Sequence, residues 1–164
     1  TLIGVLEYSA SYIHARKPFD AMLQKVKSYM KDDGVLIIAI ENKNGLKYWA
    51  GAKEDHTGKF FDGIQDYIDV DMVRTFSKPE ITRLLNRNGF DKLDFYYPVP
   101  DYKLPRAVYS EKHLPGKGDI RYHGAAYDQN RLKLFDEDTA CDGICEDGQF
   151  EYFANSFLIF ASLK

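Results

Sequence analysis

The sequence predicts an α/β domain built around a Rossmann-like sheet. Its 164 residues suffice for one domain that buries about two-thirds of its unfolded surface. Six consecutive apolar residues, Val35 to Ile40, are too few for an ordinary helix and do not alternate with polar residues, so they predict a strand buried on both faces. A second apolar run and a helical pattern precede this strand. Together the three segments predict a βαβ unit with parallel strands and a right-handed crossover.

The first elements follow from local patterns near the start of the chain. Leu2 to Leu6 is a short apolar run and predicts the first strand. Apolar residues recur at helical spacing from Phe19 to Met30, and Pro18 suits the first position of that helix. Gly34 ends the connection to the strand that begins at Val35. We expect the two strands to be adjacent, so that both end at the same edge of the sheet.

The middle of the chain contains a long loop, a helix and a strand. Residues 41–75 keep no helical or strand period, which is typical of a binding loop with short helices of its own. Ser77 and Glu80 form a capping box at the start of a helix, which ends at Gly89. Leu93 to Val99 predicts the next strand.

The last third predicts a second long loop, residues 102–149, and a final strand over Tyr152 to Leu163. The loop is basic in its first part and acidic in its last part, so the two parts are expected to attract each other. Cys141 and Cys145 fit no zinc, redox or iron–sulfur spacing, and we interpret them as structural thiols. The glycines of Lys112 to Gly118 lack the Walker spacing of a phosphate loop.

Composition argues against several classes of protein. A net charge of -3 and a pI near 5.8 give no general attraction to nucleic acid or to an anionic membrane. No apolar run has transmembrane length, no signal peptide is present, and two cysteines do not make a disulfide framework, so we expect a protein of the reducing cytoplasm. Thr1 leads directly into an apolar run, as though the chain had been cut within a sheet. We therefore expect residues 1–164 to form a single truncated domain.

Polar residues follow both predicted parallel strands at their carboxyl ends. Glu7 and Tyr8 follow the first strand, and Glu41 and Asn42 follow Ile40. Ligands of open α/β sheets bind just outside this edge, so these residues mark a candidate site, in which the Asn42 amide would hold a substrate hydroxyl or amine. Alternatively, the strand ends only meet water, and Asn-Lys-Asn-Gly forms a tight turn.

The sharpest local cluster is Glu54, Asp55 and His56. Because imidazole titrates near neutral pH and a neighbouring carboxylate raises its basicity, His56 is the candidate general base and Asp55 the residue that orients it. The alternative is an ordinary solvated loop. His56, Asp62 and Asp66 lack a recognised ligand spacing, so we expect no metal site.

Aromatic and basic side chains suggest a sugar-containing ligand. Trp49 and Tyr67 offer faces that stack on a sugar or an adenine ring. Arg74, Lys103 and Arg106 offer cationic groups for a phosphate or carboxylate. Alternatively, the aromatic residues anchor the loop to the core, and the cations pair with the acidic segment.

The order of elements and several local strings resemble the second half of class I S-adenosylmethionine-dependent methyltransferases. LIGVLEY is similar to their fourth strand and its tip, KSYMKDDGVLIIAIEN to the helix and fifth strand, and FSKPEITRLLNRNGFDKLDFYYPVPD to the last helix and sixth strand. IENKNGLKYWAGAKEDHTG and PDYKLPRAVYSE resemble a narrower group, which occurs with bacterial surface-polysaccharide glycosyltransferases.

The resemblance implies a three-layer sheet that holds strands four to seven, with the last strand antiparallel and inserted between the fifth and sixth. It implies S-adenosylmethionine as cofactor, with Glu7 and Tyr8 beside its methionine part, and a small, sugar-containing acceptor. The glycine-rich loop and the acidic residue through which the family mainly binds its cofactor are absent from this sequence. We therefore expect the chain alone to be inactive. The alternatives are a non-catalytic binding or assembly module and a carbohydrate-binding domain, and an exposed sheet edge would favour a homo-oligomer.

Overall fold

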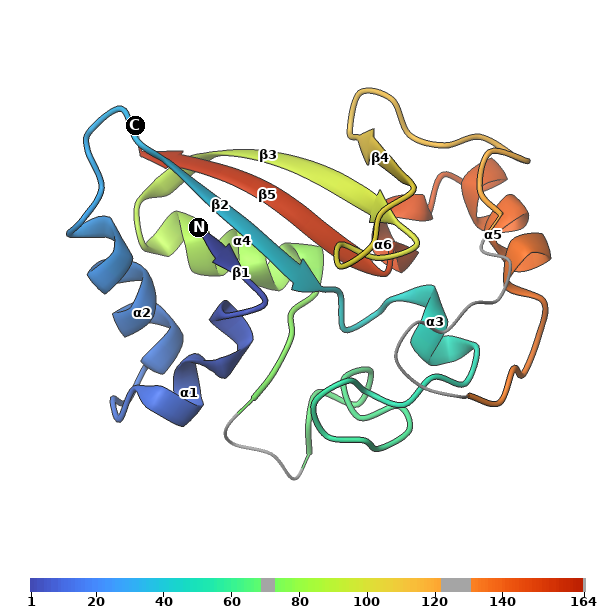
Figure 1. Cartoon of the computed structure of the whole chain (residues 1–164), viewed down its shortest axis with the longest axis horizontal. Helices are drawn as coiled ribbons and strands as arrows, with labels where there is room; N and C mark the ends of the chain where they lie inside the picture. Colours follow the sequence, from blue (N-terminus) through green and yellow to red (C-terminus); the bar gives the residue numbers. More distant parts are fainter. Residues whose placement is uncertain (69–72, 122–130, 164) are drawn as a thin grey trace.

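The computed structural model describes residues 1–68, 73–121 and 131–163. Its centre is a five-stranded mixed sheet with the order β1-β2-β5-β3-β4 (Figure 1). The strands are β1 (Leu2–Ile3), β2 (Val35–Glu41), β3 (Phe90–Val99), β4 (Ala107–Ser110) and β5 (Ser156–Leu163). The helices are the 3₁₀ helix η1 (Leu6–Tyr8), α1 (Ser9–Tyr12), α2 (Pro18–Lys27), α3 (Leu46–Trp49), α4 (Lys78–Arg87), α5 (Glu137–Glu146) and α6 (Phe150–Phe153). The predicted α/β class is confirmed, and none of the helices in the described ranges has the length and apolar character needed to span a membrane.

The βαβ unit forms as predicted, with β1 parallel and adjacent to β2. β1 is shorter than the predicted Leu2 to Leu6, because Gly4 takes a positive φ of 60° and turns the chain into η1. α2 begins at the predicted Pro18. It ends at Lys27 rather than Met30, because the chain beyond Lys27 tightens into turns with hydrogen bonds between residues three apart.

β5 lies between β2 and β3 and runs antiparallel to both, which is the position that the resemblance implies for the last strand. In one row across the sheet, Ile38, Ile159 and Phe95 lie side by side. β5 begins at Ser156 rather than at the predicted Tyr152, because the residues before Ala154 form α6.

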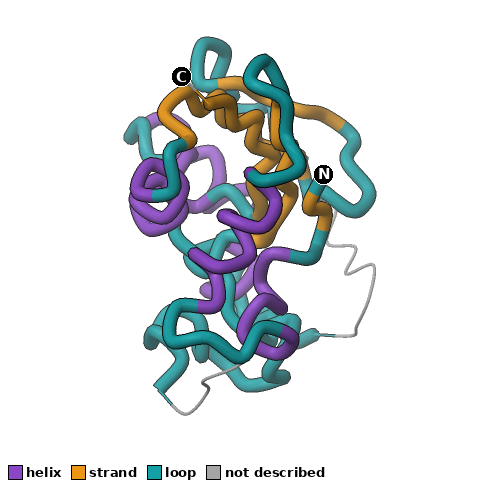
Figure 2. The backbone as a smooth tube through the Cα atoms, turned by 90° about the vertical axis from the view of Figure 1, so that its left-hand side faces the viewer, coloured by secondary structure: helices purple, strands orange, loops and turns teal. Residues whose placement is uncertain are grey.

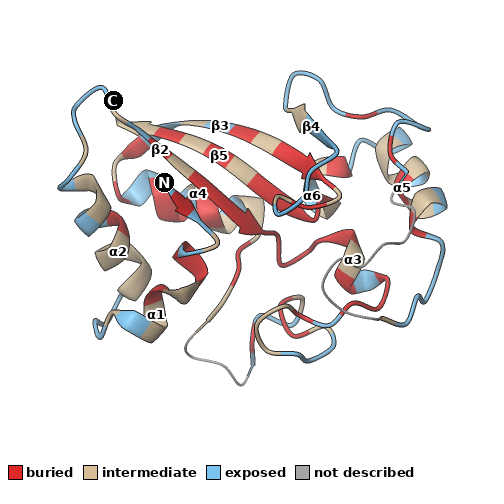
Figure 3. Cartoon of the chain, viewed as in Figure 1, coloured by how far each residue is buried: buried red, intermediate tan, exposed pale blue. Residues whose placement is uncertain are grey.

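Helices α3 and α5 lie beyond the carboxyl end of β2 (Figure 1). Helices α2 and α4 cover one face of the sheet, as Figures 1 and 2 show. On that face Ile38 and Ile159 are fully buried in the core. On the opposite face Ile3 and Val108 are each 49% exposed, and Phe160 is only partly buried (Figure 3). The described chain therefore has two layers rather than the predicted three, because this second sheet face carries no helical layer from these residues.

Of the predicted helices, α4 forms closest to the predicted position and with the predicted cap. Both halves of the Ser77–Glu80 capping box form, and the Glu80 carboxylate accepts a hydrogen bond of 2.8 Å from the Ser77 backbone N–H. Gly89 follows the helix with a φ of 87°, a conformation that glycine adopts without strain. β3 begins at Phe90, earlier than the predicted Leu93, because Phe90 is fully buried in the core.

Of the two predicted loops, the first is largely irregular and the second contains more regular structure. Residues 41–75 contain the short helix α3 and the end of β2, and otherwise turns and isolated bridges, in the part that the structure describes. Residues 102–149 are more regular than predicted, because they contain the edge strand β4 and the helix α5. Asp136 caps α5 by accepting a hydrogen bond from the Thr139 N–H. The acidic residues of the first turn of α5 suit the positive end of the helix dipole.

Charges within the second loop attract each other, as predicted. Lys117 pairs with Glu146 at 3.1 Å, and Arg121 pairs with Asp142 at 3.0 Å. Cys141 and Cys145 form no disulfide and pack in or against the core from α5, in agreement with a structural role.

Candidate functional site

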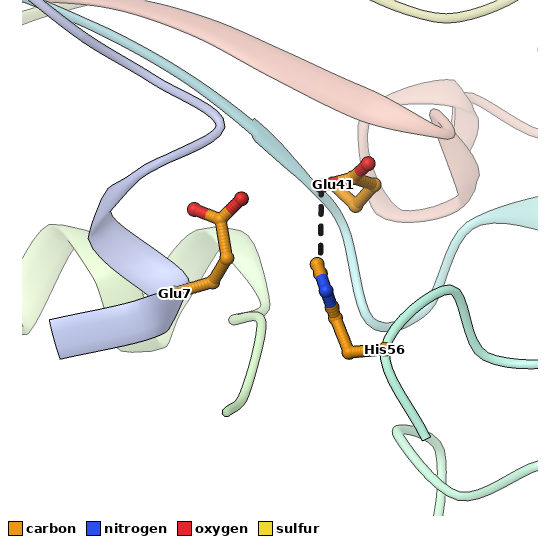
Figure 4. A group of neighbouring side chains, drawn as sticks. All are labelled: Glu7, Glu41 and His56. Atoms are coloured by element: carbon orange, nitrogen blue, oxygen red, sulfur yellow. Dashed lines mark ion pairs between the residues drawn. The ribbon is translucent and has the colours of Figure 1, made fainter. Parts of the chain in front are cut away.

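Three chain segments meet at the carboxyl ends of β1 and β2. η1 follows β1 and carries Glu7, β2 ends in Glu41, and the loop after α3 returns with His56. Figure 4 shows the three side chains pointing into the same space. We call Glu7, Glu41 and His56 the strand-end cluster.

The strand-end cluster is buried and incompletely hydrogen-bonded. Glu7 and Glu41 are each 1% exposed, and the His56 side chain is 8% exposed. His56 Nε2 lies 4.0 Å from Glu41 Oε2, and one ligand atom from each residue lies within 4.8 Å of the others. Glu7 Oε2, Glu41 Oε2 and His56 Nε2 have no hydrogen-bond partner among the described residues. Such atoms are rare in folded proteins because burying them unpaired is costly.

Burial also changes the ionisation of Glu7. Loss of water around the carboxylate raises the pKa of Glu7 from 4.5 to about 7, against the lowering effect of a backbone hydrogen bond. The negative charge of Glu41 raises this pKa further, and the positive charge of Lys103 lowers it. Glu7 and Glu41 are therefore two nearby carboxylates that both interact with the positive charge of Lys103.

Lys103 and Tyr102 face the cluster from the connection between β3 and β4. Lys103 Nζ lies 2.9 Å from Glu41 Oε1 in an ion pair, and the Lys103 side chain is 45% exposed. Burial alone would lower the pKa of Lys103, but the nearby Glu41 carboxylate outweighs this effect and raises it. The Tyr102 hydroxyl lies 2.9 Å from the point where a Cβ on Gly4 would stand, so glycine at this position leaves room for it.

Tyr8, rather than Asp55, holds the His56 ring. The Tyr8 hydroxyl lies 3.1 Å from His56 Nδ1, and the two rings meet edge to face at 5.1 Å. The Asp55 carboxylate instead accepts hydrogen bonds from Lys47 at 2.8 Å and Tyr48 at 2.5 Å. Burial raises the pKa of Asp55, but Lys47 reverses the effect and leaves this pKa below its usual value. The predicted role of Asp55 as the orienting residue of His56 is therefore not supported.

Glu54 fixes the backbone on which His56 stands. Its Oε2 accepts hydrogen bonds of 2.7 Å from the N–H groups of His56 and Thr57, and its Oε1 accepts one of 3.1 Å from the Tyr67 hydroxyl. The Tyr67 oxygen in turn lies 2.6 Å from Thr75 Oγ1 and accepts a hydrogen bond from the Thr75 N–H. We call Glu54, Tyr67 and Thr75 the loop anchor. Tyr67, predicted to bind substrate, is 5% exposed and anchors the loop to the core instead, which was the alternative prediction.

Asn42 is also structural rather than substrate-binding. Its side-chain amide donates hydrogen bonds of 2.8 Å to the carbonyls of Tyr152 and Ala154, and its Oδ1 accepts one from the Asn44 N–H. The predicted turn forms, because the Gly45 N–H donates to the Asn42 carbonyl. With both amide hydrogens used and the residue 1% exposed, Asn42 ties the end of β2 to the start of β5 and is not available to an acceptor.

The remaining predicted ligands lie outside the strand-end cluster. Trp49 is 37% exposed and donates its indole N–H to the Asn44 carbonyl, so one part of its ring system stays accessible. Arg74 pairs with Asp66 and Glu80 rather than with the acidic segment near the C-terminus. Arg106 is exposed at the turn between β3 and β4.

The structure brings together three residues that could act as metal ligands, although the sequence predicted no metal site. Asp66 pairs with Lys43 and Arg74, so it does not join His56 as a ligand. His56 instead meets two carboxylates from distant segments, Glu7 and Glu41. Both glutamates could be placed at the strand ends from the sequence. That His56 faces them could not, because the loop that carries it has no regular period.

Comparisons of the chain with protein-family models, with curated proteins and with solved structures found no match.

Proposed function

We propose that the chain is the acceptor-binding half of an S-adenosylmethionine-dependent methyltransferase site. The observation that carries the proposal is a buried polar cluster at the carboxyl ends of β1 and β2, in a sheet whose antiparallel last strand lies between β2 and β3. Ligands of open α/β sheets bind at such strand ends. We further propose a cytoplasmic protein, for which two cysteines that form no disulfide are appropriate.

The proposed reaction is a direct transfer of a methyl group to oxygen or nitrogen of a small, sugar-containing acceptor. A lone pair of the acceptor forms a bond to the methyl carbon as the carbon–sulfur bond breaks, and the electrons of that bond remain on sulfur in S-adenosylhomocysteine. The proton of the acceptor passes to His56, whose ring is oriented by Tyr8. Such a transfer depends mainly on the orientation of the two substrates, so it needs no protein nucleophile.

Side chains in and around the cluster are the proposed contacts of the two substrates. Glu7 and Tyr8 would lie beside the methionine part of the cofactor. Lys103 and Trp49, which keep exposed surface, would meet the acceptor. The main cofactor-binding loop of the resembling family is not in this sequence, so we propose that residues 1–164 alone do not transfer methyl groups.

The test is calorimetric titration of S-adenosylhomocysteine into two proteins: residues 1–164, and the natural protein that contains them. Saturable binding by the natural protein, weakened by the substitution Tyr8→Phe, is the expected result. Absence of binding by the natural protein would overturn the methyltransferase proposal.

A non-catalytic Rossmann-like binding module is the second candidate. It is favoured by exposed aromatic side chains in the loop after β2, where Trp49 is 37% and Phe60 is 49% exposed. Such faces stack on sugars. Titration with mono- and oligosaccharides in the absence of cofactor separates the two proposals, because only a binding module takes up sugar while ignoring S-adenosylhomocysteine. Sedimentation of the same samples tests a homo-oligomer through the sheet edge at β1.

A further inference from the structure

The geometry points to a divalent-cation site formed by Glu7, Glu41 and His56, suited to a transition-metal ion such as Mn²⁺, Co²⁺ or Zn²⁺ (Figure 4). The three ligands come from η1, the end of β2 and the loop after α3, so only the folded chain brings them together.

The three ligand atoms are close enough for one ion after a small adjustment. They lie within 4.8 Å of one another, and His56 Nε2 is 4.0 Å from Glu41 Oε2. Metal–ligand bonds of about 2.0–2.2 Å place neighbouring ligand atoms about 3–3.5 Å apart. The ligand atoms must therefore approach one another by about 0.5–1.8 Å, which rotations about their side-chain bonds supply.

A cation would bind one unpaired atom of each of the three residues. Glu7 Oε2, Glu41 Oε2 and His56 Nε2 are buried, lack hydrogen-bond partners among the described residues and point into one space. Within the described residues, the two carboxylates of the cluster have one ion pair with an ammonium group, that of Lys103 with Glu41, because Lys47 pairs with Asp55 and Asp101 instead. A buried charge without full compensation is costly, and a divalent ion removes the deficit.

Tyr8 prepares His56 to act as a ligand. Histidine ligands usually use their second ring nitrogen as a donor to an oxygen, which fixes the ring and leaves the first nitrogen free to coordinate. His56 Nδ1 lies 3.1 Å from the Tyr8 hydroxyl. In the tautomer in which Nδ1–H donates to this oxygen, the lone pair of Nε2 faces the two carboxylates.

The ligand set selects the class of metal. Mg²⁺ and Ca²⁺ prefer oxygen ligands alone, whereas an imidazole together with two carboxylates suits Mn²⁺, Co²⁺ and Zn²⁺. Three protein ligands leave at least one position open, for water or, on the proposed function, for an oxygen of the acceptor.

Lys103 is expected to compete with the cation. Its ammonium group lies 2.9 Å from Glu41 Oε1 and would repel a nearby divalent ion. Because nearly half of the Lys103 side chain is exposed, it can swing into solvent when the ion binds. Removing its charge with Lys103→Met should therefore tighten metal binding.

Metal coordination and general-base action are exclusive roles for His56, because both use the lone pair of Nε2. If His56 binds a metal ion, it cannot also be the general base of the proposed function, and the metal inference replaces that role. It does not depend on the methyltransferase proposal, because metal binding is measured without cofactor or acceptor. Failure of one titration leaves the other interpretable.

The experiment is calorimetric titration of MnCl₂, CoCl₂ and ZnCl₂ into the chelator-treated chain, prepared without a histidine tag, with MgCl₂ for comparison. We expect one saturable site for the transition metals and visible absorption bands from bound Co²⁺. Tyr8→Phe should weaken binding by about tenfold, the lower end of the range for groups that support a histidine ligand. Lys103→Met should strengthen binding.

The matched variants are His56→Gln in the cluster and His113→Gln at an exposed position. His56→Gln and Glu7→Gln should abolish the saturable site, whereas His113→Gln should bind as the wild type does. Circular dichroism establishes that each variant is folded. Absence of saturable binding in the wild type, or equal binding by His56→Gln and the wild type, would overturn the inference. If His56→Gln does not fold, the opposite effects expected of Lys103→Met and Tyr8→Phe decide the question.

Discussion

The loop anchor and the strand-end cluster are both buried polar groups of the same region, but they differ in how completely they are paired. In the loop anchor, both carboxylate oxygens of Glu54 accept hydrogen bonds, and the Tyr67 hydroxyl is shared with Thr75. In the strand-end cluster, Glu7 and His56 each keep an unpaired buried atom. Burial of polar residues alone therefore does not identify a site in this protein. The strand-end cluster is distinguished by unpaired atoms from three residues that lie within 4.8 Å of one another.

The two groups are also connected in sequence. Glu54 binds the backbone N–H of His56, so the satisfied group positions the unsatisfied one. Substitutions in the loop anchor should therefore reduce stability, and substitutions in the strand-end cluster should change binding. The following four predictions test this division, in order of decreasing effect on stability.

Glu54→Ala should lower the free energy of unfolding by about 3 kcal/mol, because it leaves two backbone N–H groups unpaired and removes one of the hydrogen bonds of the Tyr67 hydroxyl. Urea denaturation followed by circular dichroism measures the loss. The matched control Glu54→Gln keeps a carbonyl oxygen for the backbone donors and should lose clearly less. Equal losses in the two variants would show that the charge of Glu54, not its hydrogen bonds, matters.

Asn42→Asp should cost about 2 kcal/mol, because a carboxylate cannot donate to the Tyr152 and Ala154 carbonyls and instead faces them. The measurement is again chemical denaturation. Wild-type stability of this variant would contradict the structural role of the Asn42 amide.

Tyr67→Phe should cost about 1 kcal/mol, because it removes the hydroxyl that joins Glu54 to Thr75 but keeps the buried ring. Tyr12→Phe, at a residue that is 76% exposed, is the control and should leave the midpoint of thermal unfolding unchanged. A Tyr67→Phe protein as stable as this control would contradict the assignment of Tyr67 to the loop anchor.

Glu7→Gln should have the smallest effect and the opposite sign. In metal-free protein it should leave stability unchanged or raise it by up to about 1 kcal/mol, because it replaces an incompletely paired buried charge with a neutral group of similar shape. Thermal unfolding of metal-free samples measures this change. A loss as large as that of Glu54→Ala would remove the distinction between the two groups.

The sequence predicted those parts of the fold that depend on local signals. The βαβ unit followed from apolar runs around Pro18, and α4 followed from the Ser77–Glu80 capping box. α5 was missed because its acidic first turn was interpreted only as charge, although Asp136 is a regular helix cap. β4 is a four-residue edge strand, too short for its pattern to stand out in the second loop.

The site was predicted less completely, because its assembly depends on the path of a loop. Glu7 and Glu41 could be placed at the strand ends, since the carboxyl ends of adjacent parallel strands meet at one edge. Asp55 was assigned to His56 because the two are adjacent in sequence, but their side chains take different partners. The distinction between Tyr67 in the loop anchor and Tyr8 beside His56 depends on tertiary contacts that no local pattern records.

The position of β5 has a consequence for biosynthesis. β5 is the last strand in this sequence, yet it separates β2 from β3 at the centre of the sheet. While the chain is being synthesised, β2 and β3 therefore have no partner on their inner edges until Ser156 to Leu163 leave the ribosome. Unpaired apolar edges of this kind attract other chains. The nascent protein should thus depend most on chaperones in the interval just before β5 is complete.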